Sequence, residues 1–597
     1  MLKPMLRFFT VMLVLTVLGA NSAALAEEEI PEPLSARLQK KIEAERRRDL
    51  FTCRGELICG VADLPLFYAR RGFQPAWAAE VPLHNAVSLV AAIHAVRRDG
   101  LLTEDYHLAK IELLLDALER DRVLGLPPEP DLLVDLDLLL TDAFLLLGSH
   151  LLGGRVNPET LHAEWVAYNP KTDLAGILEA ALAAGQIEAA LDRLRPPHAG
   201  YSDLKAALQR YRDIEARGGW PPLPENLSLK EGDGGDHIAL LRQRLSVSGD
   251  LGLPEEQGEN RYDGILAEAV GRFQVRHGLP PTGRIDEQTV NELNVPAALR
   301  IRQIELNLER WRWIPHELGF RYLLVNAADY RLTVVENGQP LWDMRVVVGR
   351  DYRKTPVFSA DLQYLEINPY WNVPQKIAVE DILPKVKQNP EYLIRKHFKV
   401  FENWRAGANE IDPLTVDWSK VTKRNFRFKL RKEPGPSNDL GRIKFIMPNR
   451  FAVFLHDTPN RKLFSKSYRS YSSGCIRLEK PIELAEFLLS DDPKWTYQDI
   501  LRAVDSEQNR IVRLKKTVPV HLLYWTAWVD PEGVVNFRKD IYKRDPRLDL
   551  ALRERPPRIE LEAFGRLDNP GTAQMLTFSG AGSSSTEGRH ATENAKN

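Results

Sequence analysis

The sequence predicts a multidomain α+β protein with an N-terminal helical domain, a small three-helix module and a mainly antiparallel β domain that carries an inserted subdomain. Apolar residues recur at helical spacing in the first third of the chain, β-branched runs alternate after residue 319, and a Gly/Pro/acidic passage at residues 218–235 separates the two patterns. At 597 residues the chain exceeds what one core holds, so roughly three to five domains are expected.

The two ends of the chain differ in composition from the rest. A basic start, an apolar stretch at residues 8–20 and Ala24-Leu-Ala26 before an acidic run are typical of a secretory signal, which we expect to span residues 1–26. An uncleaved inner-membrane anchor is the alternative. Residues 568–597 are rich in Gly, Ser and Thr, and a disordered tail is expected there.

The overall composition indicates which classes of binding partner this protein is expected to have. Hydrophobic residues make up 44% and charged residues 27% of the chain, which provides enough apolar material for sizeable cores. The formal net charge of −1 argues against a large nucleic-acid footprint, so no nucleic-acid partner is expected.

Residues 30–217 read as one mostly helical domain. Helical periodicity runs through residues 132–152, 174–191 and 204–217. The first of these stretches is rich in leucine, but it contains aspartates and ends at Gly153-Gly154. These features favour a buried bundle helix over a membrane span.

Three short amphipathic helices are predicted within residues 236–298. They cover residues 238–245 and 266–277, and a third begins near Asp286. The order Leu241-Arg-x-Arg-Leu245, Phe273-Gln274, Gly278-Leu-x-x-Thr-Gly283 and Asp286-x-x-Thr289 resembles the peptidoglycan-binding domain family. An unrelated three-helix bundle is the alternative.

Residues 319–545 read as a β domain with an interruption. Successive β-branched runs lie at residues 322–326, 331–336, 342–349 and 362–367, and they resume at 444–447 and 452–455. Asn337-Gly338 is a strong signal for a type I′ hairpin. A structureless loop as long as residues 377–441 is improbable inside a compact domain, so we expect a lid subdomain there. Its basic residues near 423–432 either form a solvated edge or contact an anionic polymer.

Three cysteines in an exported chain suggest one bridge and one thiol. Cys53 and Cys59 stand close together, and an oxidising compartment favours a disulfide between them. A zinc site is the alternative, but neither a second cysteine pair nor a His-x3-His motif accompanies them. Cys475 is then the odd thiol.

The segment from His456 to Arg477 carries the candidate chemistry. Cys475 follows Ser472-Ser473-Gly474, and the apolar run at residues 451–455 leads into His456. A nucleophilic thiol needs a nearby base and hydrogen-bond donors, which a histidine and a glycine-containing turn supply. Backbone N–H groups in this turn also suit an oxyanion hole. The alternative for Cys475 is a buried small hydrophobic residue.

The motif His456-x-Thr458 followed by Ser473-Gly474-Cys475-Ile-Arg477 resembles the active-site signature of the L,D-transpeptidases, whose catalytic domain is of the YkuD type. The insertion, the wall-binding module and the helical domain together resemble the large periplasmic members of that family. Two positions depart from the common pattern, because Asp457 replaces Gly and Ser473 replaces His. The large periplasmic members are similar to this chain at both positions.

The resemblance implies a role for each site residue. Cys475 would be the nucleophile, His456 the proton donor and acceptor, and the backbone of Ser473 and Gly474 the oxyanion donors. Arg477 would bind a stem carboxylate, or else form a structural salt bridge. The substrate groove would include Trp371 and Asn372, whose alternative is aromatic packing of a sheet edge on the lid.

The resemblance also implies the reaction and its partners. A tetrapeptide stem of peptidoglycan would donate its acyl group, and the amine of a second diaminopimelate would accept it to give a 3→3 cross-link. No metal or other cofactor is expected. Wall synthases are expected partners in a periplasmic protein that remodels the cell wall and its shape.

Three other functions remain open at this point. A thiol hydrolase, or L,D-carboxypeptidase, would resolve the same thioester with water. A non-catalytic wall-binding scaffold would use residues 236–298 and keep Cys475 as a structural residue. A secreted cysteine protease is disfavoured, because a histidine so shortly before the cysteine does not match the papain-type order.

Overall fold

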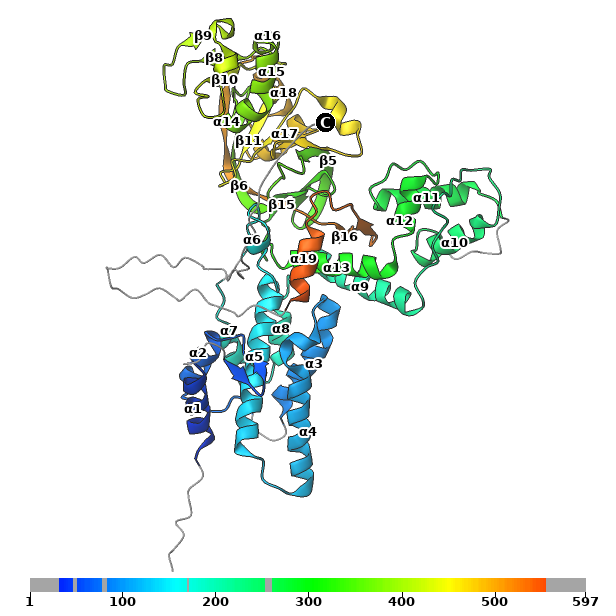
Figure 1. The fold of residues 1–597 in the computed structure, drawn as a ribbon, viewed down its shortest axis with the longest axis vertical. Helices are drawn as coiled ribbons and strands as arrows, with labels where there is room; N and C mark the ends of the chain where they lie inside the picture. The colour runs from blue at the N-terminus through cyan, green and yellow to red at the C-terminus, as the bar shows by residue number, and fades with distance from the viewer. Residues whose placement is uncertain (1–31, 47–50, 78–82, 169–170, 253–259, 555–597) are drawn as a thin grey trace, which may run out of the picture. The chain divides into compact units, whose positions relative to one another are not determined.

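The computed structural model describes residues 32–46, 51–77, 83–168, 171–252 and 260–554. The predicted signal at residues 1–26 and the predicted tail at 568–597 lie outside these ranges. The predicted α+β class is confirmed: a helical domain, a helical module and a β-rich domain follow one another along the chain (Figure 1). Within the described ranges, none of the helices combines the length and apolarity that a membrane crossing requires.

The helical domain is organised around one long helix, α5 (Pro130–Gly153), which runs beside α4 (Figure 1). Its buried aspartates are hydrogen-bonded: Asp137 accepts from the backbone N–H groups of Ala76 and Trp77 at 2.8–3.0 Å. This pairing explains how a charged residue occupies a core helix. The other elements are α1 (Leu34–Arg46), β1 (Thr52–Cys53), β2 (Glu56–Leu57), α2 (Asp63–Arg70), α3 (His84–Ala95), α4 (Leu108–Leu124), α6 (Pro158–Leu161), α7 (Leu174–Ala184), α8 (Ile187–Asp192) and α9 (Ala199–Ala216).

The predicted disulfide between Cys53 and Cys59 is wrong for this structure, in which Cys53 is a buried free thiol. The Cys53 thiol lies against Asp135, whereas the backbone N–H of Cys59 donates to Asp142 at 3.1 Å. These two aspartates are seven residues apart on α5, which corresponds to about 10 Å of helix rise. A disulfide needs its Cα atoms within roughly 7 Å of each other. Closeness in sequence was therefore misleading.

The helical module consists of α10 (His237–Val247), α11 (Gly264–Arg276) and α12 (Glu287–Leu293) around a core of its own. Asp286 caps α12 by accepting from the Thr289 N–H at 2.8 Å. Gln274 of the Phe-Gln pair is buried, and its amide donates to the Arg284 carbonyl at 2.8 Å. This glutamine therefore holds the loop before α12 and does not face solvent.

The β domain follows α13 (Ala297–Trp311) and forms one curved sheet. Within the described residues the strand order is β13-β5-β14-β12-β11-β6-β15-β3-β4, and β4 also pairs with β5, so the strands from β5 to β4 close into a ring. The strands are β3 (Arg321–Asn326), β4 (Arg331–Glu336), β5 (Gln339–Gly349), β6 (Phe358–Ile367), β11 (Ile443–Ile446), β12 (Leu455–His456), β13 (Ser470–Ser472), β14 (Ile476–Leu478) and β15 (Arg510–Leu523). Helices α17 (Pro481–Leu489) and α18 (Tyr497–Asp505) pack against the sheet.

Two local predictions in this domain have different outcomes. The hairpin at Asn337-Gly338 has positive φ angles of 51° and 71°, as a type I′ turn requires. The predicted strand at residues 452–455 is wrong over most of its length, because Ala452 has a φ of 53° and the strand β12 contains only Leu455 and His456. The pairing is also not purely antiparallel: β12–β14, β13–β5 and β15–β3 are parallel.

The insertion forms a subdomain with its own sheet and core, which we call the lid subdomain. Its strands are ordered β7-β10-β8-β9, and a buried aromatic and aliphatic cluster that includes Trp418 and Phe428 lies beneath them. It begins at β7 (Trp371–Asn372), earlier than the predicted boundary at residue 377. Its other elements are α14 (Gln375–Ile377), the π-helical turn η3 (Ala378–Ile382), α15 (Leu383–Gln388), α16 (Glu391–Arg395), β8 (Lys399–Phe401), β9 (Glu410–Ile411) and β10 (Lys429–Lys432).

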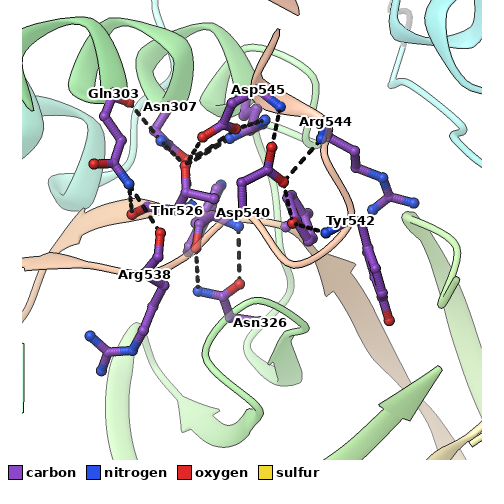
Figure 2. Close-up of polar contacts among 12 residues, drawn as sticks. Gln303, Asn307, Asn326, Thr526, Arg538, Asp540, Tyr542, Arg544 and Asp545 are labelled. Atoms are coloured by element: carbon purple, nitrogen blue, oxygen red, sulfur yellow. Dashed lines mark hydrogen bonds and ion pairs between the residues drawn. The ribbon is translucent and has the colours of Figure 1, made fainter. Parts of the chain in front are cut away.

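The C-terminal segment, residues 538–545, is fixed by a network of polar contacts (Figure 2). The carboxylate of Asp540 accepts from the backbone N–H groups of Arg544 and Asp545 at 3.0 and 2.8 Å. Gln303 of α13 donates to the carbonyl of Arg538 at 3.1 Å. The segment connects the hairpin of β16 (Ala527–Val529) and β17 (Val535–Phe537) to α19 (Asp545–Arg553). These contacts place Tyr542 at a defined position in the domain.

Candidate active site

Strand register brings Cys475 and His456 to one face of the sheet. Strands β12 and β14 are parallel, with Leu455 opposite Ile476 and His456 opposite Arg477. Leu455 and Ile476 belong to the domain core. Side chains alternate between the two faces of a strand, so His456, Arg477 and the preceding Cys475 lie on the face opposite the core.

The Cys475 turn, residues 472–475, follows β13 and leads into β14. Its Gly474 has a φ of 116°, a conformation that strongly favours glycine. The Gly474 N–H donates to the Ser472 hydroxyl at 3.1 Å. In this structure the Gly474 N–H group is thus engaged within the turn, and the role of Gly474 as an oxyanion donor stays a prediction. Cys475 as a whole residue is intermediate in exposure.

A second loop, residues 349–355, holds this turn, and we call it the cradle loop. The buried hydroxyl of Thr355 donates to the Gly474 carbonyl at 2.9 Å and accepts from the Gly349 N–H at 2.9 Å. Tyr542 of the C-terminal segment donates to the Gly349 carbonyl at 2.7 Å. Because a peptide plane is rigid and trans, fixing the Gly474 carbonyl directs the Cys475 N–H to the opposite side, away from Thr355.

His456 is almost fully buried, and its ring is held by backbone. Its Nδ1 lies 2.5 Å from the Asp457 carbonyl, which can only accept, so Nδ1 carries the proton and Nε2 keeps the lone pair. Burial lowers the pKa of His456 to about 3, and the neighbouring Arg477 and Lys444 act in the same direction. Hydrogen bonds to the backbone of Asp457 and Leu440 act against this shift. The imidazole is therefore neutral near pH 7.

The backbone carbonyl of Asp457 orients the imidazole, and the side chain of Asp457 anchors this residue. Its carboxylate accepts from the Arg442 N–H at 2.8 Å and from the Arg461 guanidinium at 3.2 Å. The carboxylate lies over Gly441, where an added Cβ would come within 2.3 Å of the Asp457 Oδ2. The aspartate in the His-Asp-Thr sequence thus has a structural role: its carboxylate binds the segment at residues 441–442 and Arg461.

The Cys475 thiol is protonated in the resting structure. Burial raises its pKa above the ordinary value, while a hydrogen bond with the backbone of Phe454 and the charges of Lys444 and Arg477 act to lower it. The imidazole on the same face of the sheet is also neutral, so the pair is a thiol and an imidazole. It is not a preformed thiolate–imidazolium ion pair.

Arg477 projects from β14 beside His456. Burial lowers its pKa, and its buried Nε has no hydrogen-bond partner among the described residues. Within those residues no carboxylate lies within ion-pair distance of its guanidinium, although Asp439 is near enough to act on its charge. The alternative of a structural salt bridge is therefore not supported. A largely buried cation beside the thiol suits a substrate that carries a carboxylate.

The two predicted groove residues lie in the lid subdomain. The partly buried ring of Trp371 packs against Phe398 of the lid core, 5.9 Å away between ring centroids, and the role of Trp371 in substrate binding stays a prediction. Strand β7 pairs with β10, and this pairing turns Trp371 inward, opposite Lys432. Asn372 is exposed on the same strand, and its role in substrate binding stays a prediction.

Sequence reasoning missed several residues that hold the site, namely Arg353, Thr355, Tyr542 and Asp457. All of them act through contacts with residues far away in the chain or through their backbone. One signal was available for two of them: a polar, charged loop directly follows the apolar strand that ends at Gly349. Loops at strand ends frequently carry functional residues.

Comparison with known proteins identifies three parts of the chain. Residues 320–505 match a family model described as "L,D-transpeptidase catalytic domain", residues 234–293 match "Putative peptidoglycan binding domain", and residues 62–208 match "Scaffold domain". The predicted resemblances of the β domain and of the helical module are confirmed by these matches. The catalytic-domain match ends before β15, although β15 completes the sheet.

One curated protein and two solved structures are similar to parts of the chain. A "Putative L,D-transpeptidase" of Haemophilus influenzae is 35% identical over 250 residues, which cover 42% of this chain and 49% of that protein. The chain thus spans about half the length of this curated relative. An L,D-transpeptidase structure from Mycobacterium smegmatis is 13% identical, with a TM-score of 0.16 and coverage of 34% of this chain and 58% of that chain. One from Stackebrandtia nassauensis is 12% identical, with a TM-score of 0.20 and coverage of 51% and 96%.

Proposed function

We propose that this protein is a peptidoglycan L,D-transpeptidase that forms 3→3 cross-links through a Cys475 thioester. The observation that carries the proposal is the parallel pairing of β12 with β14, which sets a neutral imidazole and a thiol on one face of the sheet. The match of residues 320–505 to the L,D-transpeptidase catalytic domain and of residues 234–293 to a peptidoglycan-binding domain supports the substrate class.

The first half-reaction forms the acyl-enzyme. The Nε2 of His456 takes the proton of the Cys475 thiol as the sulfur attacks the carbonyl carbon between diaminopimelate and the terminal D-Ala of a tetrapeptide stem. The Cys475 N–H, directed away from Thr355, donates to the developing oxyanion, and the Ser473 N–H remains a predicted second donor. The C–N bond then breaks, D-Ala leaves with the proton from His456, and a thioester remains.

The second half-reaction transfers the acyl group. The side-chain amine of a second diaminopimelate attacks the thioester and gives its proton to His456. An amide bond forms, the C–S bond breaks, and the returning proton restores the thiol. Arg477 binds a carboxylate of the stem, and its charge places the carbonyl carbon near the sulfur. No electron transfer is involved in either step.

The remaining predictions about context belong to this proposal. The chain is exported and acts in the periplasm on peptidoglycan that wall synthases produce, and the cross-links it forms contribute to cell shape. Fractionation of cells that produce the full chain tests the location: recovery in the cytoplasm would contradict the export prediction.

The test is incubation of the purified protein with tetrapeptide-bearing muropeptides, followed by mass spectrometry. We expect a dimer that has lost one D-Ala and whose fragments join two diaminopimelate residues. The variant C475A should give no dimer, while C53S, which changes a buried thiol outside the site, should retain the activity. A tripeptide product without dimer would identify a hydrolase. An unchanged product profile for C475A would support a non-catalytic scaffold.

A further inference from the structure

One buried arginine links three segments around the Cys475 turn. Arg353 belongs to the cradle loop and is 9% exposed. Its guanidinium donates to the Ser473 hydroxyl at 2.8 Å, to Glu380 at 2.7 Å and to Asp381 at 2.9 Å. Glu380 and Asp381 lie in η3 of the lid subdomain, and Ser473 is two residues before Cys475.

The two sides of this junction differ in how firmly they are held. On the catalytic side, Thr355 is fully buried and anchors the same turn at the Gly474 carbonyl. On the lid side, the carboxylate side chains of Glu380 and Asp381 are 36% and 30% exposed. Water can therefore reach the lid half of the junction and compete for its carboxylates. Ser473 on the catalytic side is also exposed, so the firmer anchor of the turn is the buried hydroxyl of Thr355.

The lid side of the junction also has an unusual backbone. Residues Ala378–Ile382 form a π-helical turn between α14 and α15. Such turns interrupt regular helices and frequently occur at functional sites. This turn presents two neighbouring carboxylates to one guanidinium, whose planar fork is suited to binding carboxylates.

We propose that Arg353 is a positioning residue that couples docking of the lid subdomain to the order of the Cys475 turn. When Glu380 and Asp381 bind its guanidinium, Arg353 is held where it fixes the Ser473 hydroxyl. When the lid carboxylates leave, Arg353 is no longer held, and the turn keeps Thr355 as its remaining anchor on this side. The lid thus completes the alignment of thiol and oxyanion donor as it docks. This role deepens the proposed transpeptidase function and rests on it.

The first test measures hydrogen exchange and needs no substrate. In the double variant E380Q/D381N, which alters only the lid, we expect amides of residues 470–478 to exchange at least about threefold faster than in the unchanged protein. The control is R321Q, which removes an ion pair of similar geometry between Arg321 and Glu336 on β3 and β4. Unchanged exchange of residues 470–478 in E380Q/D381N would overturn the coupling.

The second test measures kinetics in the transpeptidation assay. We expect E380Q/D381N and S473A each to lower kcat by about tenfold or more with a smaller change in KM, and the triple variant to be no worse than the more impaired parent. Effects that multiply would overturn the coupling. R353K keeps the positive charge but loses the planar guanidinium that binds both carboxylates, so we expect it to lower kcat as E380Q/D381N does. If the unchanged protein makes no cross-link while the exchange test succeeds, the proposed function fails and the coupling stands.

Discussion

The protonation state of the resting thiol gives a sharp prediction for alkylation. Burial keeps Cys475 protonated, and His456, with a pKa of about 3, is already neutral and carries no charge that would stabilise a thiolate. Below the pKa of a thiol, the reactive thiolate fraction rises about tenfold per pH unit. Between pH 6 and pH 8 the alkylation rate constant should therefore rise by about 100-fold.

The assay follows reaction of the substrate-free protein with iodoacetamide by intact-mass spectrometry across this pH range. The variant C475A measures any background from Cys53 and Cys59, both of which are buried. A second substitution tests the effect of a neighbouring positive charge on the pKa of the Cys475 thiol. Lys444 lowers the thiol pKa, so K444Q should react more slowly at each pH, whereas K515Q, at an exposed lysine paired with Asp492, should not.

A different outcome would refute this account of the site. A preformed thiolate–imidazolium pair keeps the thiolate populated at all of these pH values, so the rate constant would change by less than about threefold between pH 6 and pH 8. That result would mean that the imidazole is charged despite its burial and that the first proton transfer precedes substrate binding.

Two further predictions concern the cradle loop and the helical domain. T355V removes the hydroxyl that serves the Gly474 carbonyl and the Gly349 N–H, so we expect kcat to fall by about tenfold or more, whereas T355S should retain most of the activity. Equal kinetics for the two variants would contradict the orienting role. In the helical domain, burial acts to lower the pKa of His107, but hydrogen bonds to Asp142 and Glu56 raise it to about 9. The stabilisation is therefore fully present below pH 6.5 and is lost as the pH rises to about 9, by up to about 3 kcal/mol. Hydrogen exchange of α5 at pH 6 and pH 9 measures this loss, which should be absent in H107Q.

Much of the architecture is readable from the sequence because the signals are local. The helical period in residues 132–152 predicts α5 to within two residues at either end. Asn337-Gly338 predicts its hairpin because its residues tolerate positive φ. The predicted helix over residues 174–191 is interrupted at Gly185, which has a φ of 64° and ends α7. That glycine was visible in the sequence as a helix-ending signal.

In the candidate site, too, some features follow from local sequence signals and others depend on the fold. The sequence alone singled out Cys475 and His456, because a rare cysteine behind a Ser-Ser-Gly turn and a histidine after an apolar run carry their chemistry in their residue types. It also suggested a bridge between Cys53 and Cys59, whereas in this structure Cys53 is a free thiol and the two cysteines contact aspartates seven residues apart on α5. Two cysteines that are close in sequence can contact positions of a neighbouring helix that are far apart, and the sequence does not reveal that distance.

The tertiary structure alone decided which groups tune and align those two residues. The register of β12 against β14 sets His456 beside Arg477, and the contacts from Thr355 to Gly474 and from Arg353 to Asp381 join residues 119 and 28 positions apart. Burial then sets both pKa shifts, and burial is a property of the whole sheet and its surroundings. Amino-acid type fixes what a side chain can do, whereas its protonation state and orientation depend on neighbours that only the folded chain supplies.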